Sequence, residues 1–148
     1  MNLRRDEAGS LSVLTLSLVM IAIVLILGGG GVTSALVARM RLIDAADGAA
    51  LSAANALADT AYTQGVGKEV PLSNGGVVAA ARDYLATRPV PQDILTWTLE
   101  PQTGTPDGRT AVVAMSATVQ IPLLSQVLDA FGGSVTVSVV SRARAVVR

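Results

Sequence analysis

The chain has 148 residues, with 11 basic and 11 acidic side chains and only 3% aromatic residues. A net charge of zero and the lack of a long basic run argue against nucleic acid as a partner. Cysteine and histidine are absent, which excludes a disulfide framework, a thiol nucleophile and the commonest general base and transition-metal ligand. We therefore expect no enzyme activity, no cofactor, no metal site and no small-molecule substrate.

The N-terminal part contains one long apolar segment. No charged side chain occurs from Leu11 to Ala38, and roughly 20 apolar residues in a helix cross the hydrocarbon of a bilayer. We predict a transmembrane helix over residues 11–38, after a short cytoplasmic tail formed by residues 1–10. The alternative is a cleaved signal peptide, but the aliphatic run Leu11–Leu27 exceeds the about 7–15 residues of such signals.

The orientation of this helix depends on its flanks. Arg4 and Arg5 precede it and Arg39 and Arg41 follow it, so the positive-inside rule barely favours a cytoplasmic N-terminus. The sequence after Arg41 contains one lysine and many Ser, Thr, Ala and Val residues, a composition typical of exported domains. We expect a single-pass protein of the cell membrane whose C-terminal domain is extracytoplasmic.

Residues 39–63 are predicted to continue the helix beyond the membrane. The segment is rich in alanine, the best helix former, and its apolar residues recur at helical spacing. They are Leu42, Ala46, Ala49, Ala50, Ala53 and Leu57. Asp44 and Asp47 share a helix face, which we interpret as a solvated side rather than an acid–base or cation site.

Residues 64–148 are predicted to form a small α+β head with an antiparallel sheet. A short helix is expected at Val77–Thr87 and a second at Pro122–Phe131, opened by proline and closed by Gly132-Gly133. Strands are expected at Ile94–Glu100, Thr110–Ile121 and Ser134–Val147 from their alternation and β-branched content. Asp107-Gly108 favours a hairpin turn between the first two strands.

The first strand carries the predicted core of the head. Leu95, Trp97 and Leu99 alternate with polar residues, so we expect all three on the inward face. Trp97 is the only tryptophan and offers more apolar area than any other side chain of this chain. The alternative is an exposed Trp97 that serves as a binding hot spot.

Four consecutive glycines, Gly28 to Gly31, interrupt the apolar segment. Glycine costs about 1 kcal/mol in a helix interior relative to alanine. The pairs Gly30/Ser34 and Gly31/Ala35 have the small-xxx-small spacing that allows two membrane helices to approach closely. We predict that these four residues mediate helix packing, with a hinge as the alternative.

The two ends of the chain resemble a known family. The string Arg4-Arg-Asp-Glu-Ala-Gly-Ser10, the aliphatic run and the string from Ala38 to Ala54 are similar to the N-terminal segment of TadE/TadG-like proteins of Tad/Flp pilus assembly. The string from Val119 to Val146 resembles the end of such heads. Type IV-like prepilins are cut after a glycine and carry Glu at the fifth mature position, whereas cleavage after Gly9 would place Leu14 there.

The resemblance implies a pilin-like structural or assembly subunit of a bacterial Tad-type pilus or secretion system. Its partners would be the lipid bilayer and other pilin-like or pilus-assembly subunits. The alternative is a membrane-anchored binding module of the cell envelope that is unrelated to pili.

Overall fold

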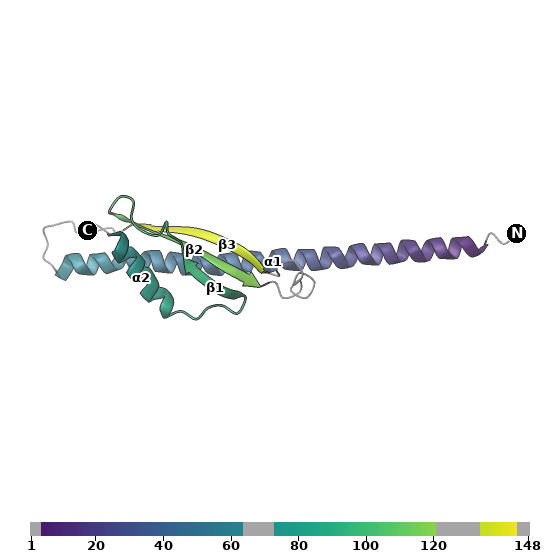
Figure 1. Ribbon diagram of the computed structural model, residues 1–148, viewed down its shortest axis with the longest axis horizontal. Helices are drawn as coiled ribbons and strands as arrows, with labels where there is room; N and C mark the ends of the chain where they lie inside the picture. The colour runs from purple at the N-terminus through teal and green to yellow at the C-terminus, as the bar shows by residue number, and fades with distance from the viewer. Residues whose placement is uncertain (1–3, 64–72, 121–133, 145–148) are drawn as a thin grey trace.

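The computed structural model describes residues 4–63, 73–120 and 134–144 (Figure 1). The element order is α1 (Arg4–Thr63), α2 (Asn74–Ala86), β1 (Ile94–Leu99), β2 (Thr110–Gln120) and β3 (Ser134–Arg144). The three strands form one antiparallel sheet in the order β1-β2-β3. The predicted α+β architecture, with a long N-terminal helix followed by a small antiparallel sheet, is confirmed.

Helix α1 is a single element of 60 residues, about 90 Å long at about 1.5 Å per residue. It contains no proline, and its distal part is rich in alanine, so nothing in the sequence interrupts the backbone hydrogen bonds. The apolar segment and the predicted projecting helix are therefore continuous. The helix also begins at Arg4, within the segment expected to be a tail.

Helix α2 starts earlier than the sequence suggests. The predicted helix begins at Val77, yet Asn74-Gly75-Gly76 form the first turn of α2. Ser73 is the N-cap, and its hydroxyl accepts a hydrogen bond from the amide of Gly76 at 3.1 Å. Such a cap satisfies one of the free amides at a helix start, which offsets the low helix propensity of the two glycines.

The core lies where α1, the sheet and α2 meet. One side of the distal half of α1 is buried by β2, β3 and α2, mainly through alanines and Leu42. Small side chains on this side allow the sheet to approach the helix closely. The buried contribution of β2 is Ala111, Val113, Met115, Ala117 and Val119.

Strand β1 departs from simple alternation at its start. Ile94 pairs with Val119, but Thr96 pairs with Thr118, so one extra residue is inserted in β1. Such a β-bulge reverses the side of the sheet on which the following residues lie. Leu95 is the extra residue and is 53% exposed. The expectation that Leu95 shares the inward face is therefore wrong, and Ile94 is buried in its place.

The other two residues of the predicted head core follow the bulge. Trp97 and Leu99 are partly buried and pack against the core cluster. They pair with Ala117 and Met115 of β2, both of which are buried. Trp97 is thus paired with a small residue on the inward face of the sheet.

The connection between β1 and β2 is held by two polar side chains. The Thr103 hydroxyl donates to the Ala114 carbonyl at 3.0 Å and accepts from the Ala114 amide at 3.1 Å, so it satisfies both backbone groups of that residue. The Asp107 carboxylate accepts from the amides of Arg109 and Thr110 at 2.9 and 2.6 Å. Gly108 adopts φ 67°, a left-handed conformation that glycine allows without a steric penalty.

Strand β3 covers residues 134–144 of the predicted Ser134–Val147 strand. Val139 and Ser141 are buried on its inward face, and Val137 is half buried. Its last predicted residues, beyond Arg144, lie outside the described residues. The predicted helix Pro122–Phe131 also lies outside them.

Candidate functional site

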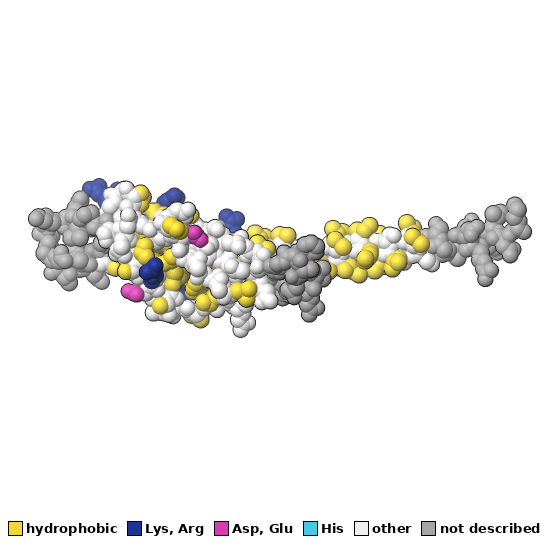
Figure 2. Space-filling model, viewed as in Figure 1, with side chains coloured by type: hydrophobic (Ala, Val, Ile, Leu, Met, Phe, Trp, Pro, Cys, Tyr) yellow, Lys and Arg dark blue, Asp and Glu magenta, His cyan; other side chains and the backbone are white. Residues whose placement is uncertain are grey.

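The proximal half of α1 is an unburied apolar rod. All side chains from Leu11 to Ile26 are exposed, and they are mainly Leu, Val, Ile and Met. Figure 2 shows this segment as a narrow extension covered by hydrophobic side chains, well away from the head. Residues Leu11–Ala56 meet the length and hydropathy required of a membrane span. Exposed apolar area on this scale is unfavourable in water, so this part of the helix requires lipid or another apolar surface around it.

The glycine segment lies where the rod meets the head, and its two sides differ. Gly31 is buried, and Gly30, Ser34 and Ala35 are half buried. Gly31 and Ala35 stand at helical spacing from Ala38 and Leu42, which are fully buried. The line of small residues on this side therefore continues into the packed side of α1.

The opposite side of the glycine segment is open. A methyl group added at Gly28 or Gly29 would meet no atom within 4 Å. The Thr33 hydroxyl on this side donates to the Gly29 carbonyl at 3.1 Å, a bond that keeps the hydroxyl satisfied inside an apolar environment. Sequence reasoning singled out the pairs Gly30/Ser34 and Gly31/Ala35 but could not tell which side of the helix the head would cover.

Exposed apolar residues continue along α1 past the rod, at the level of the head. Leu36, Met40 and Leu51 are 52%, 63% and 57% exposed. With Asp44, which is also exposed, they form a line at helical spacing that we call the exposed strip. Asp47 lies on the same line between Asp44 and Leu51 and accepts from Ser141 of β3, so the sheet borders the strip at this point.

Two polar contacts tie α1 to the head. The Ser141 hydroxyl of β3 donates to the Asp47 carboxylate, and Arg41 forms an ion pair with Asp93, just before β1. Asp47 is therefore engaged by the sheet. Asp44, its neighbour on the helix, has no side-chain partner among the described residues.

A groove of about 490 Å³ lies beside the β1–β2 connection. Its lining includes Asn74, Gln102, Thr105, Val112, Val140 and Arg142. The Thr105 hydroxyl oxygen is buried and has no hydrogen-bond partner within the described part of the chain. Arg142 is the one charged side chain in this lining, so the groove holds no acid–base pair. The described residues also contain no group of three His, Cys, Asp or Glu that could hold a metal ion.

The rod and the head together define a class of protein. In this class, a small α+β domain is built on the distal half of one long helix, and the apolar proximal half of the same helix can cross a membrane. Residues 9–56 match the family model described as putative Flp pilus-assembly TadE/G-like. The chain thus carries a TadE/G-like segment over most of α1, and the predicted resemblance is confirmed there. The match ends before α2 and the sheet, so it does not extend to the resemblance seen near the C-terminus.

No curated protein and no solved structure matches the chain. The functional assignment therefore depends on the matched segment and on the geometry of α1. The description of the family is one of pilus assembly and not of catalysis. Pilus assembly is accordingly the role that the matched segment supports.

Proposed function

We propose that the protein is a pilin-like subunit of a Tad-type pilus or secretion system. In this proposal the N-terminus is cytoplasmic, α1 crosses the membrane once, and the head stands outside the cytoplasm. The subunit acts by packing α1 against other subunits while the head is presented at the surface of the assembly.

The observation that carries the proposal is the exposed apolar surface of α1. It runs through the segment that matches the pilus-assembly family and continues at the level of the head as the exposed strip. Lipid would cover the rod and Leu36, which lies within the predicted span 11–38, whereas Met40 and Leu51 lie beyond that span at the level of the head. Burial of apolar area stabilises association by roughly 25 cal/mol per Å², and a neighbouring helix is the simplest element that can cover a narrow helical strip.

The glycine segment supports the same proposal. Small residues in membrane helices allow backbones to approach closely, and Gly28 and Gly29 are open on the side that leads toward the strip. The half-buried Gly30, Ser34 and Ala35 would contribute at the boundary between the covered and open sides of the helix, whereas Gly31 lies on the covered side.

Association of differently tagged full-length copies in native membranes tests the proposal. We expect the tagged copies, or a copy and another subunit of the same system, to co-purify. Replacement of Gly30 and Gly31 by leucine should leave membrane insertion intact, since leucine favours insertion, and should weaken co-purification. If co-purification is unchanged by both substitutions, these glycines do not mediate packing, and the interpretation of the glycine segment as a hinge is favoured.

Topology is tested separately with protease on intact spheroplasts. A C-terminal epitope should be digested if the head is extracytoplasmic. Full protection of the epitope, with the membrane shown to be intact, would reverse the proposed orientation. A tagged protein that inserts correctly but associates with no pilus subunit would instead favour an anchored binding module.

A further inference from the structure

Strand β3 is a free edge of the sheet. The strand order is β1-β2-β3, and β2 is the only described strand that pairs with β3. In Figure 1, β3 forms the upper border of the sheet, and no described strand continues the sheet beyond it. All 11 residues from Ser134 to Arg144 pair with β2 without a shift of register. The outer side of β3 is therefore a regular row of backbone groups.

The hydrogen bonds of β2 show which backbone groups of β3 point outward. The amide and the carbonyl of Val112 bond to Gly104, on the side of β2 away from β3, at 2.8 and 2.9 Å. Its cross-strand partner Arg142 therefore belongs to a non-hydrogen-bonded pair, and its amide and carbonyl point away from β2. Because the pattern repeats every second residue, the same holds for Val140, Ser138 and Thr136. Within the described part of the chain, the backbone groups of these four residues have no hydrogen-bond partner.

The two edges of the sheet differ in their protection. Strand β1, at the opposite edge, has 6 residues and a β-bulge, and short length and bulges both hinder the addition of a further strand. Strand β3 has 11 residues and contains neither proline nor a bulge. A long, regular edge is a template for another strand, so β3 is the edge at which the sheet can be extended.

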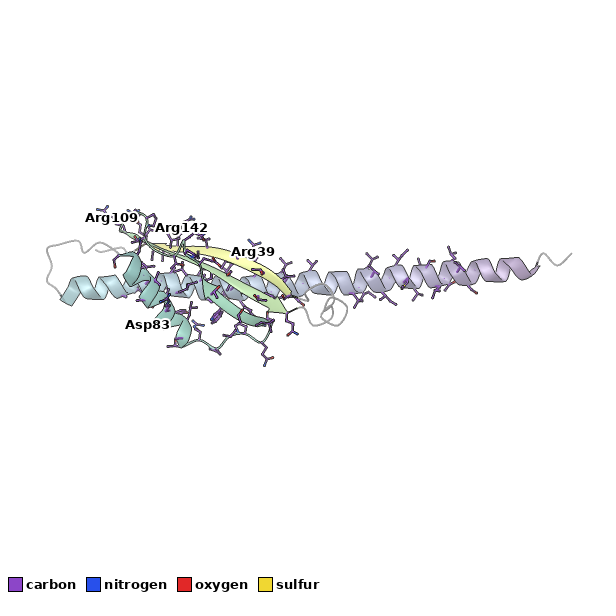
Figure 3. All side chains as sticks on the ribbon, in the orientation of Figure 1. Arg39, Asp83, Arg109 and Arg142 are labelled. Atoms are coloured by element: carbon purple, nitrogen blue, oxygen red, sulfur yellow. The ribbon has the colours of Figure 1, made fainter. Side chains whose placement is uncertain are left out.

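Positive charge accompanies this edge. Arg142 and Arg144 are exposed, and neither has a side-chain partner among the described residues. In Figure 3, Arg39 and Arg109 project to the same side of the molecule as Arg142, whereas Asp83 projects to the opposite side. The described part of β3 contains no acidic residue. The acidic residues between positions 93 and 120 all accept hydrogen bonds within the chain, namely Asp93, Glu100 and Asp107.

We infer that the free edge of β3 binds an extended acidic segment of a partner protein, which adds a fourth strand to the sheet. In this mode of recognition, backbone hydrogen bonds supply affinity and alternate side chains supply specificity. Two carboxylates separated by one residue face Arg142 and Arg144, because side chains two positions apart lie on the same face of a strand. Pairs of opposite charge on neighbouring strands are stabilising, whereas like charges are destabilising. The inference goes beyond the proposed function.

The groove beside the β1–β2 connection adjoins this edge. Val140 and Arg142 form part of its lining, and Val140 is 55% exposed. The other walls include Pro101, Pro106 and Val112. A side chain of the added strand that lies next to Val140 reaches over the groove and meets a largely apolar surface. The bound segment should therefore carry an apolar residue two positions from the first carboxylate.

A second copy of β3 fits this edge less well than an acidic segment does. Strand β3 runs along α1 (Figure 1), so copies whose helices are parallel in one membrane, as proposed above, also have parallel β3 strands. Pairing at equal height would place each arginine beside the same arginine of the other copy, which is unfavourable. An anionic polymer without amide groups would meet the arginines but leave the backbone groups of β3 unpaired. The free backbone and the arginines together favour an acidic polypeptide.

Peptide binding to the full-length protein in nanodiscs tests the inference. The labelled probes are Thr-Val-Thr-Val-Thr-Glu-Thr-Glu-Thr and the peptide of reversed sequence, which together cover both strand directions. We expect fluorescence anisotropy to show binding of at least one probe, and about tenfold weaker binding of its analogue with lysine in place of glutamate. Failure of both probes to bind, or equal affinity for the lysine analogue, would overturn the inference.

Methylation of the peptide amides tests strand addition without altering the protein. In an added strand, the amides of alternate residues face β3 and the others face away. Methylation of one alternate set should therefore abolish binding, and methylation of the other set should leave the affinity within about threefold. The set that abolishes binding identifies the strand direction. If both sets have the same effect, the peptide does not bind as a strand.

A charge reversal in the protein tests the role of the arginines. Arg142→Glu should lower the affinity for the glutamate probe about fivefold and raise that for the lysine analogue. The matched control is Arg82→Glu, an equal change of net charge at an exposed position of α2, which should leave both affinities unchanged. Equal effects of the two variants would show that net charge alone attracts the peptide and would contradict the inference.

Inorganic polyphosphate, which carries negative charge but no amide groups, serves as the competitor. It should displace the probe much less effectively than the unlabelled peptide does, and equal displacement would assign the edge to an anionic polymer instead. Arg142→Glu should not affect co-purification of tagged copies, which the proposed function attributes to α1. If copies co-purify but neither probe binds, the inference is wrong while the proposed function stands.

Discussion

Gly48 of α1 lies directly against the Tyr84 side chain of α2, and its substitution by alanine tests the packing of the head. A methyl group at Gly48 would lie 2.9 Å from Cε1 and 2.5 Å from Cζ of Tyr84, and closer still to its hydroxyl. Ordinary carbon contacts begin near 3.5 Å, so the Tyr84 ring has to move. The ring is restrained by Arg88, which donates to its hydroxyl and whose guanidinium lies 5.0 Å from the ring centroid.

Two opposing effects determine the size of the change. Overpacking of this kind costs about 1–3 kcal/mol, whereas alanine is favoured over glycine in a helix interior by about 1 kcal/mol. We therefore expect Gly48→Ala to lower the free energy of unfolding by up to about 2 kcal/mol. With about 4–8 °C per kcal/mol for a domain of this size, the melting temperature of the head should fall by several degrees.

A double-mutant cycle separates the two effects. In the background Tyr84→Ala the space beside Gly48 is free, so Gly48→Ala should be neutral or stabilising by up to about 1 kcal/mol. The matched control is Gly75→Ala in α2, where an added methyl group meets nothing within 4 Å. Thermal unfolding of the full-length protein in nanodiscs, followed by near-ultraviolet circular dichroism, gives the four values. If Gly48→Ala changes the melting temperature equally in both backgrounds, the contact with Tyr84 does not limit this position.

Two further predictions concern the sheet. Truncation of the half-buried Trp97 to alanine should lower the free energy of unfolding by about 3 kcal/mol, at the lower end for buried tryptophans. Leu95→Ala, on the exposed side of the same strand, should change it by no more than about 0.5 kcal/mol. Equal melting temperatures for both variants, together with indole fluorescence typical of water exposure in the parent, would place Trp97 at the surface. Hydrogen bonds from the backbone amide of Arg109 and from the hydroxyl and amide of Thr110 lower the pKa of Asp107 to about 2. Because the pKa of Asp is about 3.9 in an unfolded chain, the stabilisation of the turn by this carboxylate is complete above about pH 4 and is lost as the pH falls through about 2. In carboxyl ¹³C NMR, the resonance of Asp107 should titrate at a lower pH than those of the other carboxylates. Asp107→Asn should remove the pH-dependent shift of the Thr110 amide resonance over this range. A titration midpoint of Asp107 near 4 would refute the turn geometry.

Features that depend on local patterns could be predicted from the sequence. An uncharged apolar run, followed by an alanine-rich segment without proline, was sufficient to predict one continuous helix. Alternation in the three strands and the Asp107-Gly108 turn predicted the antiparallel sheet. These signals are local because side-chain periodicity and turn chemistry act within a few residues.

Tertiary packing determines which surfaces of these elements are covered, and local patterns do not reveal it. The bulge that turns Leu95 outward exists because β1 is fitted to the register of β2, and strict alternation cannot reveal an inserted residue. The early start of α2 depends on the Ser73 N-cap, whose hydrogen bond offsets the low helix propensity of the two glycines that follow. The burial of Gly31 and the exposure of Leu36 and Met40 follow from the side on which the sheet packs against α1. Such contacts join residues that are far apart in the sequence, so their outcome depends on the packing of the whole head and not on the pattern of any one segment.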